Sequence, residues 1–358
     1  EVGAALPRAS AALLAWEGAL PPDESVHAAL VADLVAASAG TESAMVFGAM
    51  TRRLNFEQPG LRNLLVRARA AAQDLSATYA DSLRALDSAW ADGTTWATIQ
   101  THSVRWTPSY LLRALDLRLL PDGRIGPIPS DQAVFVTLLA RTVEIGLGVT
   151  LLCIVLGYPA AWLLATLSGW PARVAMLCVL VPFWTSILVR SAAWFILLHR
   201  EGPLNAALRL AGLIDEPIPL IFTRPAVYVA SVHVLLPFFI LPLYGVMKNI
   251  DPDCLRAADS LGAPPWRRFL EVYLPLSAPG VAAGALIVFV MAIGFYVTPA
   301  LVGGIGDQMV GYYIAHFTRD ALNAGMAAAL SILLVGLAFI VLAAGWRVAP
   351  GRIGWWRG

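Results

Sequence analysis

The residues whose types and spacing point most directly to a function lie in a polar stretch, residues 251–275, between two long apolar runs. Asp251 suits the start of a helix, and Gly262 suits its end in a left-handed turn. A second short helix is expected over residues 266–273, leaving at an angle after two prolines. The stretch is rich in Arg and lies beside apolar runs, so it predicts a helix–turn–helix surface on which a soluble partner docks.

Polar side chains inside the apolar runs form a second group with potential chemistry, because such residues are costly in a bilayer and commonly line a solute pathway. The candidate pathway residues are Arg141, Glu144, Trp184, Arg190, His233 and Tyr296. Plainer explanations stay open. Arg141 and Glu144 could pair with each other at their i, i+3 spacing, and Arg190 could extend its charge to the interface. His233 and Tyr296 could be packed interior residues, and Trp184 an interface anchor.

Residue patterns typical of an enzyme are not found in the sequence. The five His are scattered without H-E-x-x-H spacing, and no G-x-x-x-x-G-K-[ST] phosphate loop is present. The three Cys have no metal-ligand spacing. The net charge of +1 gives no bulk attraction to nucleic acid. An ion-coupled secondary transporter is an alternative, but it would carry an internal inverted repeat, which is not visible. An integral-membrane enzyme is a weaker alternative.

Composition indicates that most of the chain lies in a lipid bilayer. Of its 358 residues, 58% are hydrophobic and only 14% are charged. Apolar runs of about 18 residues or more predict transmembrane helices. We expect an all-α integral membrane protein with five spans, at residues 133–167, 172–198, 226–247, 279–302 and 325–346.

Basic residues beside the spans predict which side faces the cytoplasm. They follow the first, third and fifth spans, which share one side if the spans alternate: Arg173, Lys248, Arg256, Arg267, Arg268, Arg347, Arg352 and Arg357. The loop at 251–275 and the tail at 350–358 are therefore expected in the cytoplasm, and residues 1–130 in the periplasm. Nothing within 1–130 could export that segment, so a sixth span is expected before Glu1.

Residues 1–130 predict a small helical extracytoplasmic domain. Apolar periodicity favours helices over 23–39, 41–54, 61–72, 74–91 and 108–117. Thr41 could cap the second of these, and the pair Asp92 and Gly93 is expected to end the fourth. A turn is expected at 121–123.

The spacing in residues 251–275 resembles the EAA loop of binding-protein-dependent ABC importer permeases, which reads E-A-A, three residues, G, nine residues and I-x-L-P. Arg256 replaces the usual Glu, and Val272 replaces the usual Ile. The resemblance implies that this loop couples the chain to a cytoplasmic ATPase. The coupling residues that it implies are Arg256, Ala257, Ala258, Asp259, Gly262, Arg267 and Arg268. An ordinary amphipathic connector is the alternative.

Further motifs resemble the spermidine/putrescine-type branch of these permeases. They include V-P-F-W-T-S-I-L-V-R at 181–190 and G-F-Y-V-T-P-A-L-V-G-G at 294–304, within a permease domain at 131–349. The resemblance implies a type I importer transmembrane domain in a bacterial inner membrane. It also implies three partners: a cytoplasmic ATPase dimer carrying ATP and Mg, a second permease subunit forming a heterodimer, and a periplasmic solute-binding protein. The chain itself is then expected to bind no cofactor and to catalyse no reaction.

The solute is the property that the sequence determines least. A polyamine would require several carboxylates or an aromatic cage, and Glu144 is the clearest acidic residue deep in a span. An opine, an amino-acid derivative or another small organic solute stays open. The resemblance implies transport by alternating access.

Overall fold

The computed structural model describes residues 2–75, 78–104, 108–120 and 124–348. Its contacts divide the chain into two compact units, Glu1–Pro129 and Ser130–Gly358. This division lies one residue from the boundary expected at 130. The tail at 350–358 and the turn expected at 121–123 lie outside the described residues.

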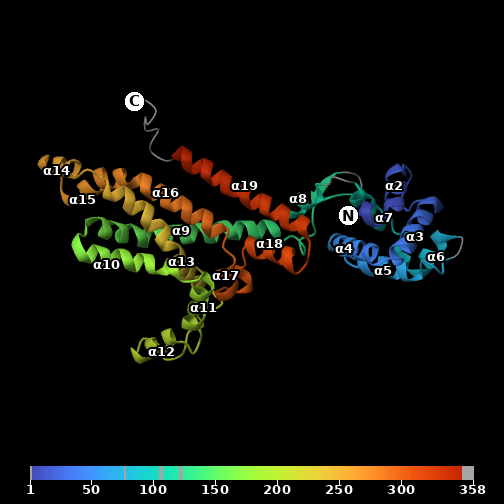
Figure 1. Cartoon of the computed structure of the whole chain (residues 1–358), viewed down its shortest axis with the longest axis horizontal. Helices are drawn as coiled ribbons and strands as arrows, with labels where there is room; N and C mark the ends of the chain where they lie inside the picture. Colours follow the sequence, from blue (N-terminus) through green and yellow to red (C-terminus); the bar gives the residue numbers. More distant parts are fainter. Residues whose placement is uncertain (1, 76–77, 105–107, 121–123, 349–358) are drawn as a thin grey trace. The chain divides into compact units, whose positions relative to one another are not determined.

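The first unit is built from short helices and one hairpin (Figure 1). Its helices are α1 (Val2–Ala5), α2 (Pro7–Ala15), α3 (Glu24–Ser38), α4 (Thr41–Glu57), α5 (Leu61–Ala71), α6 (Tyr79–Leu86), η1 (Ser88–Ala91), α7 (Gly93–Ser103) and α8 (Ser109–Ala114). The strands β1 (Leu117–Leu119) and β2 (Ile125–Pro127) pair antiparallel. The expected helical domain is therefore present with a small β element added.

Two tryptophans anchor the core of this unit. Trp90 and Trp96 are fully buried, and the Trp96 indole N–H donates to the Trp90 carbonyl oxygen at 3.0 Å. Leu13, Leu34 and Leu65 bring α2, α3 and α5 into the same cluster. Burial of these large apolar side chains is the main stabilising contribution available to short helices, which are marginal in isolation.

Several helix boundaries expected in this unit are wrong, and acidic caps explain two of them. The run at 74–91 is divided at Asp87, whose side chain accepts from the Ala89 N–H and opens η1. Asp92 accepts from the Thr94 N–H and so begins the unexpected helix α7. Thr41 is not a cap, because Gly40 occupies that position. Helices α1 and α2 lie outside all the predicted helices.

The second unit consists of long apolar helices and shorter connecting ones (Figure 1). In chain order these are α9 (Phe135–Thr166), α10 (Gly169–Leu180), η2 (Val181–Trp184), α11 (Ile187–Leu198), α12 (Pro203–Leu210), α13 (Arg224–Lys248), α14 (Pro252–Ser260), α15 (Pro265–Arg267), the π-helical turn η3 (Arg268–Tyr273), α16 (Leu274–Ile293), α17 (Val297–Val302), η4 (Ile305–Asp307), α18 (Val310–Arg319) and α19 (Ala324–Val348).

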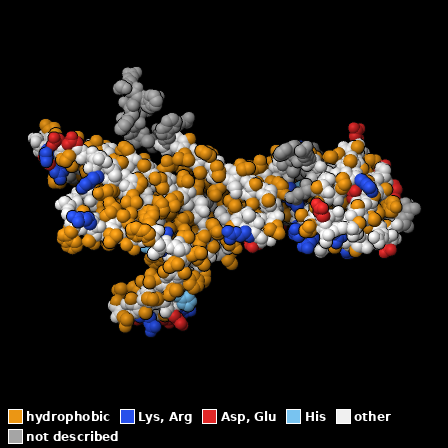
Figure 2. All heavy atoms as spheres, in the orientation of Figure 1, with side chains coloured by type: hydrophobic (Ala, Val, Ile, Leu, Met, Phe, Trp, Pro, Cys, Tyr) orange, Lys and Arg blue, Asp and Glu red, His pale blue; other side chains and the backbone are white. Residues whose placement is uncertain are grey.

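Four helices in the described residues are long and apolar enough to cross a membrane: Phe135–Thr166, Arg224–Lys248, Pro265–Ile293 and Ala324–Gly345. A fifth candidate is the pair Gly169–Trp184 and Ile187–Leu210, whose two halves are bent by 99°. The expected all-α membrane fold is thus confirmed. Figure 2 shows hydrophobic side chains over much of the visible face of this unit.

Glycines let the three central helices α9, α13 and α16 approach closely. A Cβ on Gly157 of α9 would lie 2.4 Å from a ring carbon of Phe239 in α13. A Cβ on Gly284 of α16 would lie 2.9 Å from the Phe239 carbonyl oxygen. Small residues commonly permit such close packing of helix backbones in membranes. Phe239 is itself fully buried and belongs to the core of this unit.

Two expected spans differ from the structure. The expected span at 172–198 is broken at residues 181–186, where Pro182 removes a backbone donor and Ser186 caps α11 through the Leu188 N–H. The expected span at 279–302 instead occupies Pro265–Ile293, and α17 follows it. The short helix expected at 266–273 is therefore the first part of this span. The wide turn η3 ends two residues before Pro275, which has no N–H to donate.

Candidate functional site

The elbow, defined here as residues 251–275, joins two membrane-spanning helices by way of α14. Asp251 begins α14 by accepting from the Asp253 N–H at 2.9 Å. After the helix, Gly262 adopts a φ of +75°. The Ala263 N–H donates to the Ala258 oxygen at 3.1 Å, and the Gly262 N–H donates to the Asp259 oxygen at 3.0 Å. This pair of bonds is a Schellman ending, which fixes the direction in which the chain leaves α14.

Each Arg of the elbow lies beside a carboxylate of the same elbow. Arg256 donates to Asp253 at 2.7 Å, and Arg268 donates to both oxygens of Asp259 at 2.9 and 2.7 Å. Arg267 lies 3.4 Å from Glu271. These side chains are solvent-exposed, so each pair contributes little to stability. Their consequence is electrostatic, because the elbow presents balanced charges instead of the Arg-rich surface expected from the sequence.

Apolar side chains occupy the outward tip of the elbow. Leu261 is 88% exposed and Trp266 is 60% exposed, and the Arg267 guanidinium lies 5.6 Å from the Trp266 ring centre. Ala258 is buried, whereas its neighbour Ala257 is exposed. The two alanines therefore have different environments: Ala258 permits close packing of α14, and Ala257 lies on its open face.

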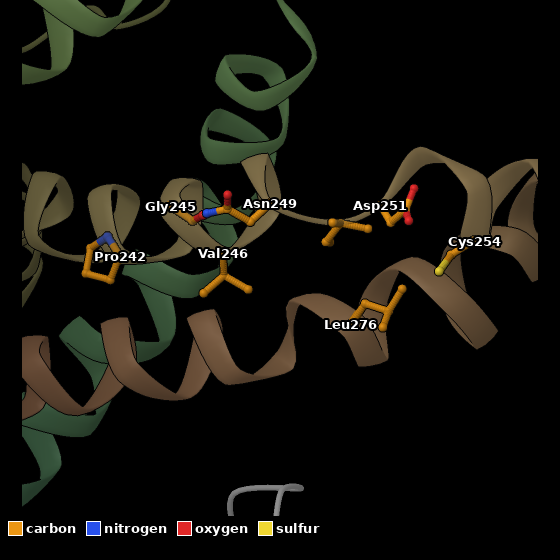
Figure 3. A pocket seen from close by; sticks show the side chains of 8 residues that line it. Pro242, Gly245, Val246, Asn249, Asp251, Cys254 and Leu276 are labelled. Carbon is orange, nitrogen blue, oxygen red and sulfur yellow. The ribbon is translucent and has the colours of Figure 1, made fainter. Parts of the chain in front are cut away.

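A pocket of about 660 Å³ lies where α13 ends and the elbow begins (Figure 3). Its lining residues are Pro242, Gly245, Val246, Asn249, Ile250, Asp251, Cys254 and Leu276. They come from the end of α13, the start of α14 and the first turn of α16. The pocket therefore lies between the two spans at the base of the elbow.

The candidate pathway residues Arg141 and Glu144 do not pair with each other. Arg141 Nη1 donates to the Gln308 carbonyl oxygen at 3.4 Å. Glu144 accepts from Arg224 Nη1 at 2.7 Å, and Arg224 Nε donates to Asp307 at 2.5 Å. Glu144 is therefore not a free acid deep in a span, because it lies level with Arg224, the first residue of α13.

Sequence reasoning missed Arg224 and Asp307. The two lie 83 residues apart, so no local spacing connects them. Their only sequence signal is position: Arg224 immediately precedes an apolar run, and Asp307 follows the Gly303–Gly304 pair of a linker.

Trp194 of α11 and His233 of α13 contact each other within the membrane-spanning part. The Trp194 indole N–H donates to His233 Nδ1 at 3.1 Å, and their ring centres are 5.7 Å apart. Arg190 lies one turn before Trp194 on α11, and its Nε is buried without a hydrogen-bond partner. Of the remaining candidates, Trp184 is 76% exposed, and Tyr296 lies at the break between α16 and α17.

The part of the chain that the structure describes contains no group of three or more His, Cys, Asp or Glu side chains that could hold a metal ion. Its free Cys153 is buried, while Cys178 and Cys254 are exposed. The described residues of this unit form a membrane bundle, an exposed elbow and a small polar group between α11 and α13.

Residues 154–349 match the family described as binding-protein-dependent transport system inner membrane components. The chain belongs to this family, which confirms the resemblance inferred from the elbow. It is therefore an inner-membrane permease component of an ABC importer that moves a small solute.

Named relatives and one solved structure support this assignment. The chain is 35% identical to the spermidine/putrescine transport system permease protein PotB of Escherichia coli (strain K12), over 60% of this chain and 78% of that one. It is 30% identical to the molybdenum transport system permease protein ModB of Mycobacterium bovis, over 62% and 82%. A bacterial ABC transporter involved in alginate import shares the fold, with a TM-score of 0.50 and 19% identity over 62% of this chain and 80% of that one.

Proposed function

We propose that this chain forms one half of the translocation pathway of an ATP-driven importer, with its elbow in the cytoplasm and residues 1–129 in the periplasm. A second permease subunit completes the pathway as a heterodimer, and a periplasmic binding protein delivers the solute. A cytoplasmic ATPase dimer binds ATP and Mg. This chain binds neither and hydrolyses no ATP.

The observation that carries the proposal is the continuity of the elbow with a membrane span. After Gly262, the chain enters the helix Pro265–Ile293 without a further break. A displacement of the elbow is thus transmitted along the axis of α16, since a helix is far stiffer than a loop. The fixed Schellman ending keeps α14 at a defined angle to this lever.

The paired charges of the elbow and its exposed apolar residues support a contact with the ATPase that is mainly apolar. Exposed ion pairs contribute little to binding energy, whereas a Trp that enters a partner's pocket commonly contributes much. Leu261 and Trp266 are therefore the main anchors in this proposal, and Arg256, Arg267 and Arg268 set specificity around them. ATP-driven closure of the ATPase dimer moves the elbow, and α16 carries the movement into the pathway to alternate its access.

The proposed solute is a small organic molecule: polyamine-like, an opine or an amino-acid derivative. The name of the Escherichia coli relative favours a polyamine, but the molybdenum relative shows that related permeases carry solutes of different chemistry. Within the described spans, the acid Glu144 is already engaged by Arg224, so it is a poor ligand for a polyamine.

Gly262→Val tests the coupling role. The φ of +75° at Gly262 disfavours a β-branched residue, although an added Cβ would meet no atom within 4 Å. We expect the reconstituted four-component complex to lose most ATP-dependent uptake and most stimulation of ATP hydrolysis by the binding protein, while the chain still inserts into the membrane.

Gly212→Val is the matched control. Gly212 has a φ of +68° and equally open surroundings, but it follows α12 on the opposite side of the membrane in the proposed topology. Normal uptake by Gly262→Val, or equal losses in both variants, would remove the coupling assignment.

A further inference from the structure

We propose that Arg190 and His233 bind a carboxylate group of the transported solute. The imported molecule is then an acid or a zwitterion, such as an opine or an amino-acid derivative, and not a simple polyamine. This inference rests on the proposed importer function and narrows its solute.

The hydrogen bond from Trp194 determines what His233 can offer a ligand. An indole nitrogen can only donate, so His233 Nδ1 must accept the bond at 3.1 Å. The ring is therefore neutral and carries its proton on Nε2. His233 is exposed within this chain, and its free edge is a hydrogen-bond donor.

Arg190 adds a cation to the same face. It lies four residues before Trp194, one turn away on α11, and residues at this spacing share a helix face. Its Nε is buried without a partner, and no ion pair or hydrogen bond of its guanidinium is found among the described residues. Its position near the N-terminus of α11 does not stabilise its charge, because the helix dipole there favours an anion over a cation.

The acidic side chains of Glu144 and Asp307 are already paired with another cation. Glu144 and Asp307 both contact Arg224, so neither is a free counter-ion for Arg190. The group formed by Arg190 and His233 therefore presents only donors. A carboxylate supplies the missing acceptors and charge, and a guanidinium binds it through two parallel bonds. A polyamine is itself a donor-only cation, so it would leave these donors unsatisfied.

Arg190 and His233 also lie at a depth in the membrane that suits a solute-binding site. His233 is the tenth residue of the 25-residue helix α13, about 14 Å from its start at 1.5 Å per residue. This is close to the middle of a hydrocarbon layer about 30 Å thick. Arg190 follows the break in the bent pair α10 and α11. Transporters commonly bind solutes near the midplane, beside discontinuous helices.

The test uses the complete importer in proteoliposomes, with an equimolar mixture of 4-aminobutyrate, glutamate, putrescine and spermidine outside. Putrescine and 4-aminobutyrate are of similar length, and an amine of one replaces the carboxylate of the other. We expect ATP-dependent uptake of a carboxylate-bearing member and not of the diamine. Arg190→Gln should lower that uptake about tenfold or more, mainly through KM, while Arg190→Lys retains part of it.

The control is Arg209→Gln, the same change on the exposed face of α12, which should leave uptake unaltered.

Three uptake results would overturn the proposal. The first is uptake of putrescine or spermidine alone, and the second is uptake of none of the four solutes while the binding protein still stimulates ATP hydrolysis. The third is uptake that Arg190→Gln does not change. Loss of subunit co-purification in Arg190→Gln also overturns it, because Arg190 would then pair with a carboxylate of another subunit. An absence of any ATP dependence in the unaltered complex would instead count against the importer function.

Discussion

Glu57 in the first unit shows how single residues place charge away from water. Its side chain is 12% exposed, and Arg53 contacts it at 2.8 Å. Arg113 lies 3.7 Å from its second oxygen, and His102 Nε2 lies 3.6 Å from the first. One carboxylate thus holds together α4, α7 and α8. Arg190 in the second unit is the contrasting case, since no such acid contacts it in the described residues.

Glu57→Gln is expected to destabilise the first unit by about 3 kcal/mol, because the neutral amide leaves Arg53 and Arg113 as uncompensated buried cations. Hydrogen exchange of peptides from residues 2–129, measured on the purified chain, would detect the loss of protection. Arg67→Gln is the control: Arg67 is 57% exposed and pairs with Asp87, so its loss should change stability by less than about 1 kcal/mol. Equal effects of both changes would refute the structural role of Glu57.

The same carboxylate predicts an acid limit for the first unit. Burial alone raises the pKa of Glu57, but His102, followed by Arg53 and Arg113, outweighs burial and holds the pKa below its ordinary value. The folded state therefore favours the ionised form, and the stabilisation is fully present above the unfolded pKa of about 4.5 and is lost as pH falls through the lower folded value.

Exchange protection, corrected for intrinsic rates, should thus stay constant between about pH 7 and 5 and fall below about pH 4. Glu57→Gln should lack this contribution. A decline of equal size in that variant would show that other groups set the acid limit.

At the scale of elements, the close approach of α13 and α16 depends on the absence of a side chain at Gly284. A Cβ there would lie 2.9 Å from the oxygen and 3.3 Å from the Cα of Phe239. Both are backbone atoms, so no change of rotamer relieves the contact. The helices must separate or shift to admit even one methyl group.

Gly284→Ala is therefore expected to destabilise the bundle by about 1–3 kcal/mol, seen as a lower thermal unfolding midpoint in detergent. Gly336→Ala is the matched control on α19, where an added Cβ meets nothing within 4 Å. That change should leave the midpoint unaltered or raise it slightly, since Ala is the better helix former. Indistinguishable midpoints for the two variants would contradict the packing argument.

At the scale of the whole molecule, function depends on the side of the membrane that each loop occupies. The linker that contains α12 and the elbow lie at the two ends of α13, so they fall on opposite sides if α13 crosses the membrane once. Cys254 is an exposed thiol of the elbow, and Asp215 is exposed in the linker. The two positions can therefore report the topology.

A membrane-impermeant maleimide should label Cys254 only after the inner membrane is permeabilised. Cys254→Ser should remove that signal, because Cys153 is buried and Cys178 lies within the apolar helix α10. With both exposed cysteines changed to Ser, Asp215→Cys should be labelled in intact spheroplasts. Labelling of Cys254 from outside would place the elbow in the periplasm and remove its ATPase role.

Much of the fold follows from local signals. Hydropathy located the helices α9, α13 and α19 within a few residues, and turn chemistry at Asp251 and Gly262 gave the shape of the elbow. The errors fall where local signals conflict. Residues 74–91 have one helical periodicity but contain the capping residue Asp87. The predicted short helix at 266–273 and the predicted span beginning at 279 are one continuous helix, Pro265–Ile293, which includes the wide turn η3.

The sequence by itself determined that this chain spans a membrane and carries a capped helix that ends in a turn at Gly262, because hydropathy, caps and turns act between neighbouring residues. Only the tertiary structure decided which charges meet. Arg224 joins Glu144 and Asp307 across 80 and 83 residues, and the elbow cations are balanced in part by the packing of η3 on α14. Arg190 has no acidic partner among the described residues, and its Nε is buried without a hydrogen bond. Such pairings depend on how helices pack, and the distances between side chains of different helices are not encoded in any local spacing.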